Sequence, residues 1–403
     1  MVLKNKVIVF LGNTHFDGAI KATSVFLARE MAVQNKVFFI DYPLTLKDLF
    51  TPNNPDDLEI SKKKSHIFSG GLIDTDLPNL KIIITPPVIP INFFPEGKIF
   101  RAFLKVNEAI ISHRINAILK KEGITDFIYI NSFNFHYPHI AKLIKPSISI
   151  YQCVDPMIIP YDMKHGIISE SELVKESDLV ICTSRALYNE KKQLNSKTYF
   201  VPNAADVDHC SLELHPDLPI HEKLKDLPKP IIGYLGTIER RIDYELLLNI
   251  IAASPNKTFV FVGPVWESYV PEELFNAPNA RFIGPVPYDE MPQIIKGFDV
   301  AIIPFKKDEV SKTIFPLKLF EYLSAGKPVV ATDFNDDLKE YTGDMIKYCS
   351  DADSFIQSIN EELKNDSPVK MQQRLALAKE NTWENRSDKI EEIINSHLKP
   401  HAS

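Results

Sequence analysis

The chain has 403 residues, of which 44% are hydrophobic and 25% charged, a composition typical of globular proteins and a length that suits two domains. It contains no run of about 18 apolar residues, which argues against a membrane-spanning helix, and its four cysteines form no metal-binding or disulfide pattern. Residues 1–205 carry 24 Lys and Arg against 20 Asp and Glu, whereas residues 206–403 carry 22 against 33. The acidic second half argues against a nucleic acid partner, and the scattered cysteines favour the cytoplasm.

The first half alternates short apolar runs with amphipathic segments, which predicts a parallel α/β sheet. Residues 43–80 read as a polar excursion with some short strands. Strands are predicted at residues 6–11, 36–42, 82–85, 126–132, 147–155 and 178–184, and helices at 19–34, 98–121, 169–176 and 185–192.

Polar residues that follow the predicted strands are candidates for chemistry, because the carboxyl ends of parallel strands line the ligand crevice of such sheets. His15 and Asp17 lie in the loop after the first strand, which lacks a dinucleotide-binding GxGxxG motif. Asp155 ends the strand 147–155. The alternative for His15 and Asp17 is helix capping, and the alternative for Asp155 is a turn before Pro156.

Exposed apolar residues beside basic ones predict contact with an anionic membrane surface. Ile89, Ile91, Phe93 and Phe94 lie in a proline-broken loop just before the basic helix 98–121. The alternative is that the loop simply packs under this helix.

The second half restarts the α/β pattern after a proline-containing linker at 209–229. Domains are therefore predicted at 1–208 and 230–383. Strands are expected at residues 231–235, 258–264, 300–305, 328–331 and 346–349, and helices from Asp243, within 317–323, at 354–363, at 371–380 and at the C-terminus.

One helix of the second half has a pattern suited to a nucleotide. Lys318 and Glu321 project from one side of it, because they are three residues apart. Pro316 stands in its first turn, where free backbone N–H groups suit a phosphate. Lys318 would add a charge, and Glu321 could accept hydrogen bonds from a ribose diol. The alternative is a solvated Lys–Glu pair.

The stretch FPLKLFEYLSAGKPVV at residues 315–330 resembles the nucleotide-sugar segment of GT-B glycosyltransferases, especially the family-4-like enzymes that build bacterial cell-surface polysaccharides. VPNAADVD (201–208) and TWENRSDKIEEIINSHL (382–398) are similar to other segments of that family. The resemblance implies two Rossmann-like domains that face a cleft, with a C-terminal helix (about 384–403) crossing back to the first domain.

The resemblance also implies a donor site in the second domain. A basic pair, made by Arg240 or Arg241 together with Lys318, would hold the donor diphosphate, and Glu321 would hold the ribose. The segment 281–295 would cradle the base. The donor-binding residues are then Gly236, Thr237, Arg240, Arg241, Val286, Pro287, Tyr288, Pro316, Leu317, Lys318 and Glu321.

The implied activity is sugar transfer from a nucleotide-diphosphate sugar, UDP-sugar favoured, to a hydroxyl of a glycan or lipid-linked acceptor. Asp155 is the first choice for the base, with His15 or Asp17 in reserve. Because cationic side chains serve the leaving group, no metal or cofactor is expected, and the DxD sequences at 74–76, 206–208 and 351–353 are read as surface or linker residues.

Thr313 departs from the family pattern, which has a Glu at this position, and this leaves the sugar and the stereochemical outcome open. Asp308 or Glu309 are possible substitutes. Two other functions remain as alternatives, a non-catalytic sugar-nucleotide-binding subunit and a GT-B-type UDP-sugar 2-epimerase. The expected location is the cytoplasm, including the inner face of the plasma membrane.

Overall fold

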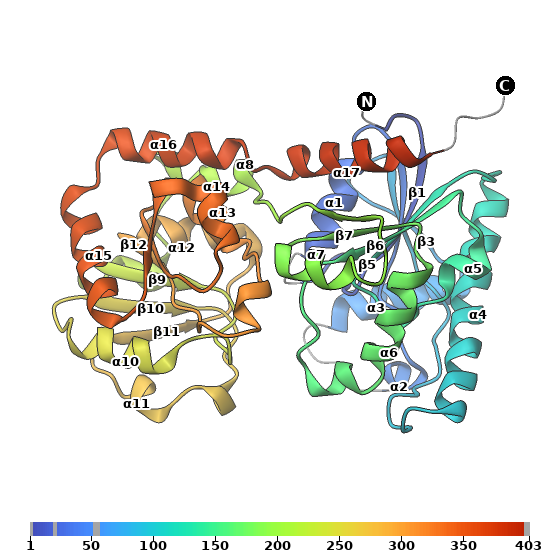
Figure 1. The fold of residues 1–403 in the computed structure, drawn as a ribbon, viewed down its shortest axis with the longest axis horizontal. Coiled ribbons are helices and arrows are strands. Elements are labelled where there is room, and N and C mark those ends of the chain that lie inside the picture. Colours follow the sequence, from blue (N-terminus) through green and yellow to red (C-terminus); the bar gives the residue numbers. More distant parts are fainter. Residues whose placement is uncertain (1–2, 19–21, 51–56, 399–403) are drawn as a thin grey trace. The chain divides into compact units, whose positions relative to one another are not determined.

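The computed structural model describes residues 3–18, 22–50 and 57–398. They form two compact units, each considered by itself below (Figure 1). Unit 1 comprises Met1–Pro202 with Arg386–Ser403, and unit 2 comprises Asn203–Asn385.

Unit 1 is built on an eight-stranded sheet with the order β3-β4-β2-β1-β5-β6-β7-β8, in which only the edge strand β3 is antiparallel to its neighbour. Its central strand β1 is flanked by β2 and β5, so the strand order reverses direction between β1 and β5. Ligands of open α/β sheets bind outside the carboxyl ends of strands at such a switch point. The strands are β1 (Val7–Leu11), β2 (Lys36–Ile40), β3 (Leu72–Asp74), β4 (Leu80–Ile83), β5 (Ile128–Ser132), β6 (Ile148–Cys153), β7 (Leu179–Cys182) and β8 (Thr198–Phe200).

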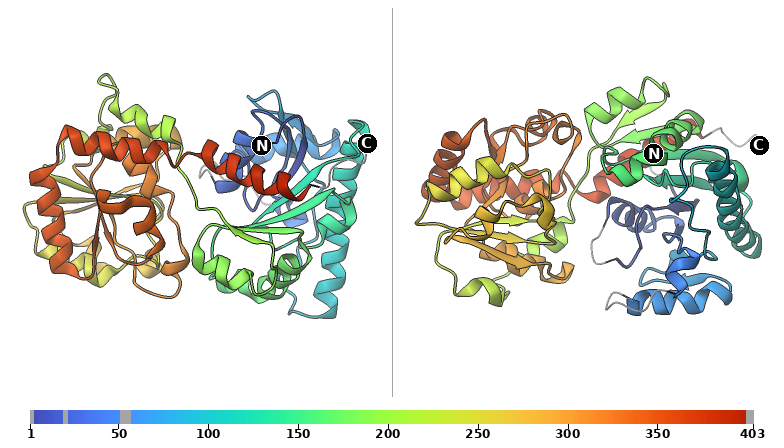
Figure 2. Two further views of the ribbon diagram at one scale, coloured as in Figure 1. Left: turned by 45° about the horizontal axis from the view of Figure 1, so that its top comes forward. Right: turned by 90° about the horizontal axis from the view of Figure 1, so that it is seen from below.

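Side chains alternate across this sheet, so its two faces form separate apolar cores. Ile8 and Phe10 of β1 lie in one core with residues of α1 and α17, whereas Val9 and Leu11 lie in the other with residues of α4. Helices α1 and α4 therefore cover opposite faces of the sheet (Figure 2). The helices of unit 1 are α1 (Thr23–Met31), α2 (Leu46–Phe50), α3 (Asp57–Phe68), α4 (Lys98–Lys121), α5 (Ile140–Ile144), α6 (Pro160–Glu176) and α7 (Arg185–Lys191).

Helix α17 (Trp383–His397) begins in unit 2 and continues into unit 1. Ile390 and Ile394 are buried in the same core as α1. Glu391 accepts a hydrogen bond from the Leu3 backbone N–H at 3.0 Å, which ties this helix to the segment before β1.

Unit 2 contains a six-stranded parallel sheet with the order β11-β10-β9-β12-β13-β14 and a switch point between β9 and β12. Gly233 in β9 leaves room for the Phe298 ring, since a Cβ there would lie 2.2 Å from it. The strands are β9 (Ile231–Leu235), β10 (Thr258–Val262), β11 (Ala280–Gly284), β12 (Val300–Ile303), β13 (Val329–Thr332) and β14 (Ile346–Cys349).

Several helices of unit 2 begin at residues whose side chains cap them. Asp243 accepts from Leu246 N–H at the start of α10, and Asp351 and Ser354 form a capping box at the start of α15. The helices are α8 (Val207–Ser211), α9 (Glu222–Lys225), α10 (Tyr244–Ala252), α11 (Glu272–Phe275), α12 (Met291–Gly297), α13 (Lys318–Ser324), α14 (Asp337–Thr342), α15 (Ala352–Asn365) and α16 (Pro368–Lys379), with 3₁₀ turns η1 (Leu212–Leu214), η2 (Glu267–Tyr269), η3 (Tyr288–Glu290), η4 (Ser311–Thr313) and η5 (Gly343–Met345).

Outside the candidate site, the structure differs from the sequence expectations in three places. The polar excursion 43–80 contains the helices α2 and α3. Helix α6 begins at Pro160, so Ser169 lies inside it rather than at its N-terminus. The segment 209–229, expected as a linker, belongs to unit 2, where Leu224 is buried in the core.

Within the part of the chain that the structure describes, none of the helices has the length and apolar character needed to cross a bilayer.

Candidate functional site

The Lys318 amine lies at the switch point of the unit 2 sheet. It donates to the Tyr234 hydroxyl at 2.7 Å and lies 4.0 Å from the centre of the Tyr234 ring. Its distance to the centre of the Phe305 ring is 5.1 Å. Because Tyr234 belongs to β9 and Phe305 follows β12, the two strands that flank the switch point hold this cation between them.

Gly236 is the residue that leaves space for the amine. It follows β9 with φ of +137°, and a Cβ at this position would lie 2.5 Å from Lys318 Nζ. Any other residue type would strain the backbone and displace the lysine. Thr237, next in the loop, accepts a hydrogen bond from the Tyr234 hydroxyl through its backbone carbonyl at 3.0 Å.

The Lys318 amine loses its proton more readily than an ordinary lysine. Desolvation, reinforced by the charge of Arg241, lowers the pKa of Lys318 to about 7. Of the two adjacent arginines, Arg241 is thus the one whose charge acts on Lys318; its guanidinium lies 5.8 Å from the centre of the Phe305 ring and bonds to Glu239. Arg240 has its Nη2 buried without a hydrogen-bond partner among the described residues.

Glu321 is the acidic counterpart of Lys318 on the same helix. Desolvation raises the pKa of Glu321 to about 7, against the opposing effect of Lys318, and the charge of Asp206 raises it further. Burial thus shifts the pKa of both the amine and the carboxyl group toward their neutral forms, so that each is about half ionised near pH 7. Such perturbed pairs mark candidate sites for a ligand that can restore both charges.

Tyr288, expected in the base pocket, is held by residues of α8 and its N-terminus. Its ring stacks on His209 with centres 4.2 Å apart, and its hydroxyl donates to Asp206 at 3.2 Å. One ring face is therefore occupied. Val286 is half-buried against the unit 2 core, and Pro287 is exposed.

Pro316 and Leu317 precede α13 rather than forming its first turn, since the helix begins at Lys318. Pro316 is buried and Leu317 is half-buried. The helix has seven residues, so the charge of Lys318 would contribute more to anion binding than the helix dipole.

The region around Thr313 shows no acidic group in place of the missing Glu. The Thr313 hydroxyl donates to the Val310 carbonyl at 2.6 Å. Asp308 accepts from the Ser311 N–H at 2.7 Å, and Glu309 forms an exposed pair with Lys312. Both acids are thus engaged locally.

The DxD sequences have local partners. Asp76 pairs with Arg29 at 2.6 Å, and Asp351 caps α15. Asp206 caps α8 and, unlike the other two, its charge also acts on Glu321. Among the described residues, no group of three or more His, Cys, Asp and Glu side chains is placed to hold a metal ion.

Unit 1 presents a His–Asp pair after the carboxyl ends of β1 and β2. His15 Nδ1 lies 2.8 Å from Asp41 Oδ2, and Asp41 also accepts from the Phe16 backbone N–H at 2.8 Å. The Lys63 amine lies 2.9 Å from the same carboxylate. Burial opposes ionisation of Asp41, but the hydrogen bond from His15 and the charge of Lys63 outweigh it and lower the pKa of Asp41. The carboxylate therefore stays charged and fixes one ring nitrogen of His15.

A cavity of about 490 Å³ lies in unit 1 beside these residues. Tyr42, which follows β2, lines it and makes an edge contact with the His15 ring at 6.0 Å. His136, which follows β5, also lines it, and desolvation lowers the pKa of His136 to about 4, so this ring is neutral at pH 7. The other lining groups include Asp48, Asn92, Phe93, Phe100, Tyr137 and Tyr161.

Asp155 and Asp17, the other two predicted catalytic residues, are exposed. Asp155 follows β6, and its backbone carbonyl accepts from the Cys153 thiol at 3.8 Å. Asp17 follows His15 in the loop after β1. Neither of them lines the unit 1 cavity.

The sequence did not reveal the residues that bond to the predicted site residues, or shift their pKa, from distant positions in the chain. Asp41 holds His15, Tyr234 receives Lys318, and Asp206 acts on Glu321. Asp41 offered a signal, since it lies at the carboxyl end of the predicted strand 36–42, as Asp155 does in the strand 147–155. The partners in unit 2 offered none, because they lie 84 residues or more from the residues that they contact.

Residues 229–365 match the family model described as Glycosyl transferases group 1. Unit 2 therefore contains a group 1 glycosyltransferase domain. This glycosyltransferase domain includes the switch point with Tyr234, Gly236, Lys318 and Glu321. Over 214 residues, 49% of its length, the chain is 28% identical to TuaH of Bacillus subtilis (strain 168), named as a teichuronic acid biosynthesis glycosyltransferase, and it spans 53% of that relative.

Solved structures extend the likeness to the whole chain. The sucrose-phosphate synthase of Thermosynechococcus elongatus superposes with a TM-score of 0.66 at 15% identity, over 97% of this chain and 99% of that one. HepE of Anabaena, solved with UDP, superposes with a TM-score of 0.63 at 13% identity, over 97% and 100%. These likenesses show the fold: the predicted GT-B architecture of two parallel α/β sheets is confirmed.

Replacing Asp41 should destabilise unit 1. In an Asp41→Asn variant, the buried Lys63 loses its counter-charge, and removal of one partner from a buried pair costs about 3–5 kcal/mol. Urea unfolding should report a loss of that order. Asp17→Asn, an exposed change in the loop after β1, is the control and should leave the midpoint unchanged. Asp41→Asn/Lys63→Met should recover part of the loss; an equally unstable double variant would contradict the pairing.

Proposed function

We propose that the protein transfers a sugar from a nucleotide-diphosphate sugar, UDP-sugar favoured, to a hydroxyl of a glycan or lipid-linked glycan acceptor. The observation that carries this proposal is the Lys318–Glu321 pair at the switch point of a group 1 glycosyltransferase domain. The names of similar proteins support it, since HepE was solved with UDP and with UDP-glucose. The four free, buried cysteines support a reducing compartment such as the cytoplasm.

In this proposal, Glu321 accepts hydrogen bonds from the ribose diol and Lys318 pairs with the diphosphate. A dianionic ligand would favour the protonated amine, whose pKa is otherwise lowered by desolvation and Arg241. A diol would favour the carboxylate, whose pKa is otherwise raised by desolvation. The donor would thus supply what each group lacks. Gly236 and Thr237 would leave backbone room for the phosphates, and Val286, Pro287 and Tyr288 would meet the base.

Departure of the diphosphate needs positive charge where negative charge develops. We assign this role to Lys318 and Arg241, with Arg240 as a further cation from the same loop. Cationic side chains from the loop after β9 and from α13 could stabilise the leaving group without a metal ion, which is the basis for proposing metal-independent transfer.

The acceptor hydroxyl needs a group that orients it and removes its proton. We propose His15 for this role, because a buried carboxylate fixes its Nδ1 side and leaves Nε2 to act. The neighbouring cavity, lined by tyrosines, His136 and Asn92, suits a glycan that needs stacking surfaces and hydrogen bonds. Asp155, at the carboxyl end of β6, is the second candidate.

Affinity for UDP-glucose should depend on pH with a maximum near 7. Below this value Glu321 becomes protonated and loses the diol, and above it Lys318 loses the proton that the diphosphate requires. On either side of the maximum, the affinity changes by at most about tenfold per pH unit, because a single proton is involved on each side. Isothermal titration should show only the alkaline fall in Glu321→Gln and only the acid fall in Lys318→Arg.

Glu321→Ala should weaken binding about 10–100-fold, since a hydrogen bond to a charged group contributes about 1.5–3 kcal/mol; unchanged affinity would disprove the ribose assignment.

Replacing His15 should strongly slow sugar transfer and leave the affinity for the donor unchanged. His15→Gln should lower kcat by about 10²–10⁴-fold, the usual contribution of a general base. Donor affinity from titration should stay at the wild-type value. Asp155→Asn, measured in the same assay, should lower kcat less than His15→Gln does. A larger loss of kcat in Asp155→Asn would assign the base to Asp155. Release of UDP during transfer to an acceptor also distinguishes transfer from mere binding.

Chelation should leave transfer unaffected. Because Lys318 and Arg241 would neutralise the departing diphosphate, EDTA should change the initial rate by less than about twofold, far below the 10²–10³-fold cost of removing one stabilising group. UDP release from UDP-sugar in the presence of acceptor is the measurement. A rate lost with EDTA and regained with Mg²⁺ would contradict the metal-free proposal.

A further inference from the structure

Helix α4 separates its charges by face. Its 24 residues include six lysines and arginines but a single acid, Glu108. Glu108 is buried and contacts His139, through the backbone N–H at 2.7 Å and the ring at 3.2 Å. The solvent side of α4 is therefore free of acids along its whole length.

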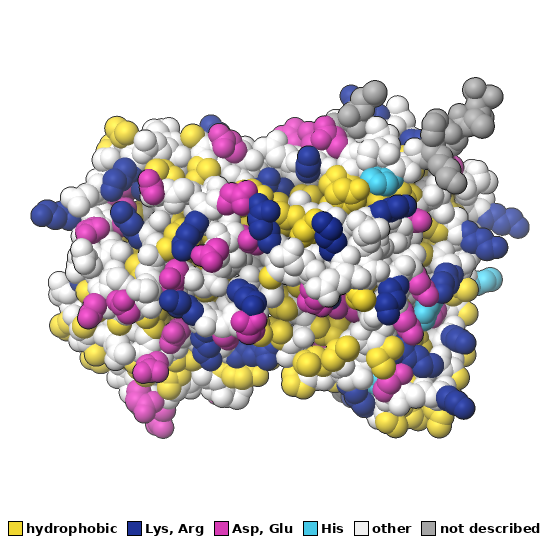
Figure 3. All heavy atoms as spheres, in the orientation of Figure 1, with side chains coloured by type: hydrophobic (Ala, Val, Ile, Leu, Met, Phe, Trp, Pro, Cys, Tyr) yellow, Lys and Arg dark blue, Asp and Glu magenta, His cyan; other side chains and the backbone are white. Residues whose placement is uncertain are grey.

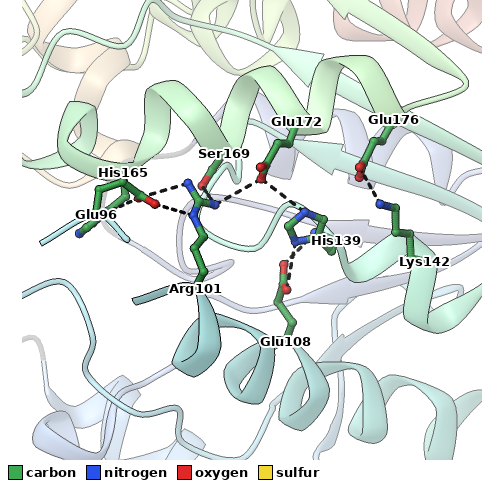
Figure 4. A network of polar contacts seen from close by, with 9 residues as sticks. All are labelled: Glu96, Arg101, Glu108, His139, Lys142, His165, Ser169, Glu172 and Glu176. Atoms are coloured by element: carbon green, nitrogen blue, oxygen red, sulfur yellow. Dashed lines mark hydrogen bonds and ion pairs between the residues drawn. The ribbon is translucent and has the colours of Figure 1, made fainter. Parts of the chain in front are cut away.

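A polar network fixes the inner side of α4 to its neighbours (Figure 4). Arg101 bonds to Glu96 at 2.7 Å and to Ser169 and Glu172 of α6 at 3.1 and 3.2 Å. Glu96 in turn contacts His165 at 2.9 Å. These contacts pair Glu96 and Glu172 with basic groups, and they hold α4, α6 and the loop before α4 together as one rigid platform.

The outer side of α4 is apolar where a surface helix is normally polar. Ile99, Phe103 and Val106 are 62%, 36% and 45% exposed, and they lie at helical spacing on one stripe. The exposed lysines Lys98 and Lys105 flank this stripe. Figure 3 shows apolar and basic side chains together along the edge where Figure 1 places α4.

The loop before α4 extends the stripe at one end. Phe93 is 70% exposed and contacts Phe94 at 4.2 Å between ring centres, and Phe94 stacks on Phe103 at 5.5 Å. The Lys164 amine of α6 donates to the Asn92 and Phe93 carbonyls at 2.8 and 3.3 Å, which fixes the loop and adds a cation beside it.

At the other end of the stripe, α4 and the Pro86–Pro87 turn form a shallow groove of about 640 Å³, lined by Lys105, Val106, Ala109, Ile110 and His113. This groove also contains basic and apolar groups without an acid. We call the whole surface, from Phe93 along the outer side of α4 to Pro86, the α4 face.

We propose that the α4 face docks on an anionic phospholipid bilayer, with Phe93, Ile99 and Phe103 at the boundary between headgroups and acyl chains and Lys98, Lys105 and Lys164 at the headgroups. An acid-free basic stripe with aromatic and aliphatic side chains is the composition of interfacial helices. The net charge of −7 does not oppose this, because at physiological ionic strength only charges within about 8 Å of the lipid count strongly.

The docked face also borders the unit 1 cavity. Phe93 and Asn92 belong both to the loop that carries the α4 face and to the cavity lining. A bilayer against this face would therefore bring the cavity to the level of the headgroups. Resting on the proposed function, this identifies the acceptor class as a hydroxyl borne by a membrane lipid rather than a free glycan.

Vesicle co-sedimentation tests the docking. The full chain should sediment with phosphatidylcholine vesicles that contain phosphatidylglycerol, sediment poorly with pure phosphatidylcholine, and be released by high salt. Ile99→Glu/Phe103→Glu should reduce the partition coefficient by at least about tenfold, since it removes inserted apolar area and adds like charge. Val33→Glu is the matched control: Val33 is 68% exposed and follows α1, on the opposite face of the sheet.

A second variant protects the test against misfolding. Lys98→Gln/Lys105→Gln keeps the apolar stripe and should weaken binding about fivefold per lysine on phosphatidylglycerol vesicles, with little effect on neutral ones. All these positions lie in unit 1, so the urea unfolding midpoint of unit 1 should stay close to the wild-type value in every variant and serves as the fold check. Equal sedimentation of wild type, both α4-face variants and the control would overturn the proposal.

Three further outcomes are decisive. If the wild type fails to bind vesicles but forms a concentration-dependent dimer that Ile99→Glu/Phe103→Glu abolishes, the α4 face binds a second copy and the membrane proposal is wrong. If vesicles bind as expected but no UDP-sugar is bound or consumed, the docking stands and the proposed transfer fails. Transfer to a water-soluble acceptor at the same rate as to a vesicle-borne one would overturn the assignment of the acceptor.

Discussion

The constraint on which the rest of unit 2 depends is the placement of one amine between two strand ends. Tyr234 and Phe305 come from strands that flank the switch point, and the absence of a side chain at Gly236 leaves the space that Lys318 occupies. A cation lodged against aromatic rings rather than water keeps its charge only weakly. The donor proposal, the role of Arg241 and the pairing with Glu321 all follow from this single placement.

Local pattern predicted much of this site, because the informative residues share one short helix. The spacing of Lys318 and Glu321 and the apolar run after them required no knowledge of the fold. Asp41 and Asp206 were missed since their effect comes through tertiary contacts. The start of α6 was misplaced because Ser169 and Glu172 imitate a capping box, whereas they contact Arg101 from within the helix. Parallel sheets and the bounds of α4 followed from periodicity alone.

Unit 1 divides its titratable groups between two tasks. At the carboxyl ends of β1 and β2, Asp41 remains charged and orders His15, while desolvation keeps His136 neutral at pH 7. Under α4, acids and bases neutralise one another and fix helices in place. The first arrangement suits a catalytic role, and the second suits a rigid support. The charged residues of unit 1 therefore have different roles according to their neighbours.

Because Lys318 and Glu321 titrate in the same range, one proton suffices for both. The pair can exist as amine plus carboxylic acid or as ammonium plus carboxylate, and its total charge is zero in either form. A ligand that prefers the ionic form could obtain it by moving that proton along one turn of α13, without exchange with the solvent. The neutral form would then avoid the full cost of two desolvated charges.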